Sequence, residues 1–80
     1  MGKVTKDNPY RKALVDLILS INRIVPLEEP DRVLLLIQLD TEEKIMAFNN
    51  WVKSKADGET LNTTAIEIMN QSAKIGRGKF

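Results

Sequence analysis

The stretch of sequence that decides the fold is Val33-Leu34-Leu35-Leu36-Ile37-Gln38-Leu39. Six of its seven side chains are apolar, and it contains neither a charge nor a glycine. Because the run is apolar in every direction, the neighbouring segments must cover it from several sides. A buried strand is the competing interpretation, since periodicity cannot separate strand from helix in so short a run. A lone strand would leave its backbone groups unpaired, and no other segment alternates or shows a hairpin turn, so a helix is predicted.

The segment before this run has the pattern of an amphipathic helix. Asn8-Pro9 is a suitable start, because asparagine can cap free backbone N–H groups and proline suits the first helical turn. Pro26 ends the helix, since proline cannot continue the hydrogen-bond pattern. Pro30-Asp31 then marks the start of the second helix. The apolar residues of the first helix recur at spacings of four and three: Tyr10, Leu14, Leu17, Ile21 and Ile24.

Two further helices are predicted after the run. Asp40 and Glu43 form a capping-box pattern that starts the third helix, which ends at Ala56-Asp57-Gly58. Its inward stripe is Ile45, Phe48, Val52 and Ala56. The fourth helix starts at one of several caps within residues 59–64, ends before Gly76, and has an inward stripe of Leu61, Ala65, Ile68, Ser72 and Ile75. The expected fold class is therefore all-α: a small four-helix bundle with a short, buried, central second helix.

The length and composition indicate one soluble domain over residues 1–80, with residues 1–7 and 76–80 expected to be flexible. The chain has no cysteine and no histidine, so disulfides, thiol nucleophiles and imidazole bases are excluded. No apolar run approaches the roughly 20 residues that span a bilayer, and the first residues do not resemble a signal peptide. A cytoplasmic location is expected.

Neither a metal site nor an active site is predicted. Carboxylates are the only candidate ligands, and their spacing matches no calcium-binding loop. Paired catalytic carboxylates need a cleft, and a core of this size leaves little room for one. We therefore expect no cofactor, no metal and no enzymatic activity. The acidic residues are better explained by favourable charge at helix starts: Glu28, Glu29, Asp31, Asp40, Glu42 and Glu43.

Charge is distributed unevenly, although the net charge is only +1. Residues 1–12 are net +3, residues 13–50 net −4 and residues 51–80 net +2. If the first and last helices lie close together, the basic ends could contact the phosphates of a nucleic acid. Against this, the exposed side of the last helix offers few groups that read bases. The candidate contacts are Lys3, Lys6, Arg11, Lys12, Lys74, Arg77 and Lys79.

A protein interface is suggested by apolar residues that fall outside the inward stripes. Val15 and Leu19 lie one turn apart on the flank of the first helix, and Met46 points away from the stripe of the third. Trp51, at the edge of that stripe between lysines, could anchor a partner. The alternatives are that residues 1–7 or the connector Pro26–Pro30 cover the first pair, and that a tryptophan is often only partly covered in a small core.

The sequence therefore supports two hypotheses about function. The first is a non-catalytic protein–protein interaction module that binds another protein or a second copy of itself. Its candidate interface consists of Val15, Leu19, Met46 and Trp51. The alternative is a small nucleic-acid-binding protein that uses its basic N- and C-terminal segments. No sequence motif identifies the partner.

Overall fold

The structure is a computed structural model that describes residues 9–79, which are mostly helical. The expectation of a helical fold is confirmed at this level. The predicted flexible residues 1–7 and the predicted cap Asn8 lie outside the described part. The elements are α1 (Pro9–Ile24), α2 (Glu29–Gln38), α3 (Glu42–Lys55), β1 (Ala56–Asp57), β2 (Thr60–Leu61) and α4 (Ala65–Gly76).

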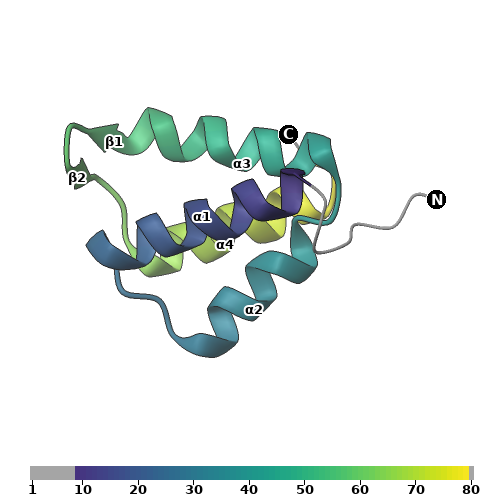
Figure 1. Ribbon diagram of the computed structural model, residues 1–80, viewed down its shortest axis with the longest axis horizontal. Helices are drawn as coiled ribbons and strands as arrows, with labels where there is room; N and C mark the ends of the chain where they lie inside the picture. Colours follow the sequence, from purple (N-terminus) through teal and green to yellow (C-terminus); the bar gives the residue numbers. More distant parts are fainter. Residues whose placement is uncertain (1–8, 80) are drawn as a thin grey trace.

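Helices α1 and α4 lie at the middle of the molecule, with α3 and α2 on opposite sides of them (Figure 1). Both α2 and α3 pack against α1 and against α4. The side chains between them form one continuous core, to which every helix contributes. Its buried apolar members are Leu14, Ile18, Ile21, Leu27, Leu35, Leu39, Ile45, Phe48, Val52, Leu61, Ile68 and Ile75.

The second helix is not the buried centre that the sequence predicts. Leu35 is 0% exposed, but Val33 is 49%, Leu34 41% and Ile37 64% exposed. Because α2 packs against α1 and α4 on one side only, a helix with 3.6 residues per turn can direct only part of its surface into the core. The second helix is short, as expected, with 10 residues, but the expectation that it is buried and central, wrapped by the other three, is wrong.

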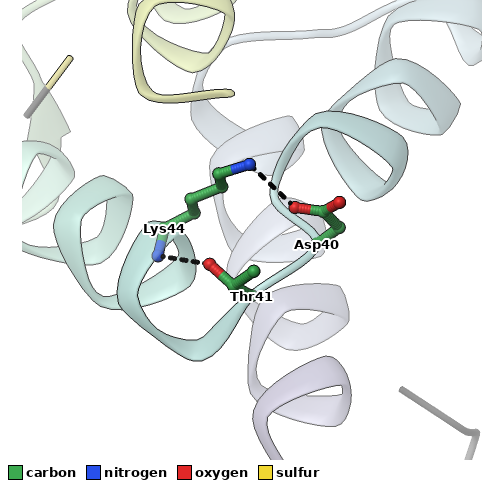
Figure 2. Close-up of polar contacts among 3 residues, drawn as sticks. All are labelled: Asp40, Thr41 and Lys44. Carbon is green, nitrogen blue, oxygen red and sulfur yellow. Dashed lines mark hydrogen bonds and ion pairs between the residues drawn. The ribbon is translucent and has the colours of Figure 1, made fainter. Parts of the chain in front are cut away.

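The cap of α3 is Thr41, one residue later than predicted. Figure 2 shows the Thr41 hydroxyl oxygen accepting a hydrogen bond from the backbone N–H of Lys44 at 3.2 Å. Asp40 instead forms an ion pair with the Lys44 ammonium group, with 3.0 Å between Oδ1 and Nζ. Thr41 directly precedes the first helical residue and has an extended backbone, which is the geometry that lets a side chain reach the first free amides.

A short hairpin that the sequence does not predict joins α3 to α4. Ala56 pairs with Leu61, and Asp57 with Thr60, in antiparallel register. Gly58, at the first position of the two-residue loop, has a φ of +65°, a conformation that favours glycine. Each strand has only two residues, too few to show alternation. The hairpin brings β2 against α1 and buries Leu61 in the core.

Helix α4 is fixed at its start by a cap and along its length by a close contact with α2. Thr64 and Glu67 form a reciprocal capping box. Further along, the buried Ser72 hydroxyl donates to Gln38 Oε1 at 2.6 Å. A Cβ atom at Gly76 would lie 3.2 Å from the Cβ of Gln38, so the missing side chain allows this close approach. These contacts set the position of α2 relative to the core.

Candidate functional site

Exposed apolar side chains gather on adjacent parts of α1 and α2. Val15 and Leu19 are one turn apart on α1, rotated away from the buried stripe. Val33 and Ile37 are likewise one turn apart on the exposed side of α2. We call these four residues, together with the groove between the two helices, the α1–α2 face.

The groove is mostly apolar, with a volume of about 150 Å³. It is lined by Val15, Ile18, Leu19, Arg32 and Leu36. Leu36 is partly buried and packs against the core. Because residues three and four apart are neighbours on a helix, Leu36 continues onto Val33, which is adjacent to Ile37. The apolar surface therefore extends from α1 across the groove to the outer side of α2.

Hydrogen bonds in the connector hold α1 and α2 in this arrangement. Leu27 is buried, and its backbone N–H donates to Asn22 Oδ1 on α1 at 2.7 Å. The Arg32 guanidinium, which lies on α2 at the groove, donates to the Leu27 carbonyl oxygen. The connector is thus bonded to both helices by side chains. It does not cover Val15 and Leu19, because both remain exposed.

The other two predicted interface residues lie elsewhere. Met46 borders a separate hollow of about 230 Å³ between α1 and α3, beside Tyr10 and Leu17. Trp51 is partly buried and stacks on Phe48, with ring centroids 6.1 Å apart. The Lys55 ammonium group lies 5.9 Å from the centre of the Trp51 ring. The structure therefore brings Val15 and Leu19 together but places Met46 and Trp51 at two other sites.

The predicted basic residues meet acidic ones at one end of the molecule. Lys3 and Lys6 lie outside the described residues, and Arg11 is partly buried, whereas the rest are exposed: Lys12, Lys74, Arg77 and Lys79. Figure 1 places the start of α1 and the end of α4 at the same end of the long axis, together with the start of α3. A hydrogen bond to Glu42 on α3 raises the pKa of Tyr10 on α1, so acidic groups reach this end too. The surface there is of mixed charge.

The sequence pattern does not single out Val33 and Ile37 as surface residues. The all-apolar run Val33–Leu39 predicts the core for both, with a second subunit as the alternative cover where the neighbouring helices leave part of the run exposed. No local signal marks these two residues, because every other position of the run except Gln38 is apolar and Gln38 itself packs on the buried Ser72.

The described residues show neither a cluster of ligands nor a membrane-crossing helix. In residues 9–79, no three carboxylates gather as a metal ion would require. Over that same range, no helix is both long and apolar enough to span a bilayer. No model of a protein family matches the chain, and searches of curated proteins and of solved structures also found no match.

Proposed function

We propose that this protein is a non-catalytic protein–protein interaction module that binds its partner through the α1–α2 face. The observation that carries the proposal is a mostly apolar groove lined by Val15 and Leu19, with the exposed Val33 and Ile37 on the outer side of α2. Solvent-exposed apolar side chains are ordinary when scattered, but a contiguous patch over two helices is typical of a binding surface. Covering this patch would remove apolar area from water, which drives association.

The side-chain hydrogen bonds around the connector also support this proposal. They link α1 to α2 through Leu27, so the two halves of the face are held in place before a partner arrives. A preorganised surface loses less conformational entropy on binding than a mobile one. The face therefore combines an apolar groove with a fixed geometry.

Nucleic-acid binding is the second candidate, and the four exposed basic residues at one end of the molecule favour it: Lys12, Lys74, Arg77 and Lys79. Asp40, Glu42 and Glu43 are also exposed near that end, at the start of α3. Phosphates are repelled by carboxylates, so a mixed surface is less favourable to them than a uniformly basic one. Protein binding is therefore the better-supported function.

Photo-crosslinking in the organism that encodes the protein tests the proposal. A photoreactive phenylalanine analogue at Ile37 is expected to form a covalent adduct with a protein, whereas the same analogue at Ile66 is not. The two positions are a matched pair, because both are exposed isoleucines (64% and 73%) but Ile66 lies on α4, outside the face. The mass of the adduct identifies the class of partner.

Three results would contradict the proposal. The first is the absence of any adduct at Ile37. The second is equal crosslinking at Ile37 and Ile66, which would indicate nonspecific contact. The third is an adduct with nucleic acid, which would favour the second candidate instead.

A further inference from the structure

The apolar pairs of the α1–α2 face are bracketed by charges of opposite sign on the two helices. On α1 the exposed stripe is Lys12, Val15, Leu19 and Arg23, with the exposed Asp16 beside Lys12 and Leu19. On α2 and just beyond its end it is Glu29, Val33, Ile37 and Asp40, with the partly buried Arg32 at the groove. The two charges in each stripe are eleven residues apart, about 16 Å on α1, whereas Asp40 lies two residues beyond the end of α2. One stripe is basic at both ends and the other is acidic at both ends, over the same number of residues.

The direction of the helices decides how these stripes can meet. In Figure 1, α1 runs from right to left close to the long axis, whereas α2 rises from lower left to upper right, so α2 runs against α1 at an inclination to it. Arg23 and Glu29 therefore lie toward one end, and Lys12 and Asp40 toward the other. None of Lys12, Arg23 and Glu29 forms an ion pair in the described part of the chain, whereas Asp40 already pairs with Lys44.

We propose that the partner is a second copy of this chain, bound so that α1 of each copy packs on α2 of the other. This inference rests on the proposed function of the α1–α2 face. A two-fold axis parallel to the helices produces the arrangement, which is isologous and closes after two copies. It places Arg23 opposite Glu29 of the second copy and Lys12 opposite its Asp40, while Val15 and Leu19 pack against Val33 and Ile37.

Charge complementarity selects this arrangement over the other two-fold packing of the same face. If the axis ran across the helices, α1 would lie on α1 and α2 on α2. Lysine and arginine would then face each other, as would glutamate and aspartate, and such like-charge contacts oppose association. Only the packing of α1 on α2 matches both charge and apolar length.

Reversing single charges and then mixing the variants tests the arrangement. Arg23→Glu and Glu29→Arg are each expected to weaken the dimer at least about tenfold in sedimentation equilibrium at low salt, because each creates two like-charge contacts. An equal mixture of the two variants is expected to recover the affinity of the unmodified protein, since both contacts in the mixed dimer again join opposite charges. Lys53→Glu, an exposed reversal on α3, is the matched control and should leave the affinity unchanged.

Several outcomes would overturn the inference. If the mixture does not recover the affinity of the unmodified protein, Arg23 and Glu29 interact within one chain or not at all. Unchanged affinity in both variants would exclude this packing. A monomeric unmodified protein at every concentration would exclude self-association, and an Ile37 adduct with a different protein would then leave the proposed function standing. The absence of both a dimer and an Ile37 adduct would contradict the dimer and the proposed function alike.

Discussion

Replacing Leu35 with alanine is expected to lower the free energy of unfolding by about 2–5 kcal/mol. Leu35 lies on the side of α2 that faces the core and is fully buried. Its truncation therefore removes apolar contacts and leaves a cavity. Small domains have roughly 0.05–0.15 kcal/mol of stability per residue, which is about 4–12 kcal/mol for 80 residues. The substitution therefore removes a large part of the total stability. Urea denaturation followed by circular dichroism measures the change.

The matched control is Ile37→Ala, two residues further along the same helix. Because Ile37 is 64% exposed, its truncation is expected to change the free energy of unfolding by less than about 0.5 kcal/mol. The measurement is made at the lowest protein concentration that gives a signal, since dimerisation would add to the apparent stability. Equal losses at the two positions would contradict the one-sided packing of α2 and support a second helix that is buried on all sides.

The second large effect is expected on self-association. Leu19→Glu should weaken the dimer by about a hundredfold or more, because it places an unpaired carboxylate in the apolar centre of the interface. Leu19 is half exposed in the single chain, so the fold should be retained, as circular dichroism can verify. Light scattering over a concentration series measures the loss.

Met46→Glu is the control for this experiment. Met46 and Leu19 are equally exposed (51%), but Met46 lies on α3 beside a different hollow. The control should associate like the unmodified protein. A dimer that survives Leu19→Glu and is lost with Met46→Glu would place the interface between α1 and α3 and contradict the α1–α2 face.

Most of the helices and their buried stripes could be predicted because the signals are local. Leu14 and Ile21 on α1, and Ile45, Phe48 and Val52 on α3, recur at helical spacing and are buried in the structure. The hairpin between α3 and α4 could not be predicted, since two-residue strands have no periodicity. The choice of Thr41 over Asp40 as the cap of α3 depends on the residue at which the helix begins, and sequence patterns place helix ends only within a residue or two.

The position of α2 depends on information that the run Val33–Leu39 does not contain. An all-apolar segment shows that burial is favourable, but the number of helices available to cover it is a property of the tertiary packing. Within residues 9–79, the main neighbours of α2 are α1 and α4, and Val33 and Ile37 stay exposed.

The candidate interface was partly predictable for a related reason. Val15 and Leu19 depart from the inward stripe of their own helix, which is a local signal. The tertiary packing decides which part of another helix lies beside Val15 and Leu19, and a local sequence pattern does not contain that information. The sequence therefore gives no reason to separate Met46 and Trp51 from this pair, although the structure places each of them at a separate hollow.

The location of the interface is tested most directly by recording ¹H–¹⁵N spectra of the unmodified, isotope-labelled protein at increasing concentration. If two copies bind through the α1–α2 face, the amide signals that shift with concentration will lie in residues 12–23 and 29–40, and those of α3 and α4 will stay in place. Concentration-dependent shifts centred on α3 and α4 would contradict binding through the α1–α2 face. Spectra that do not change up to the solubility limit would contradict self-association.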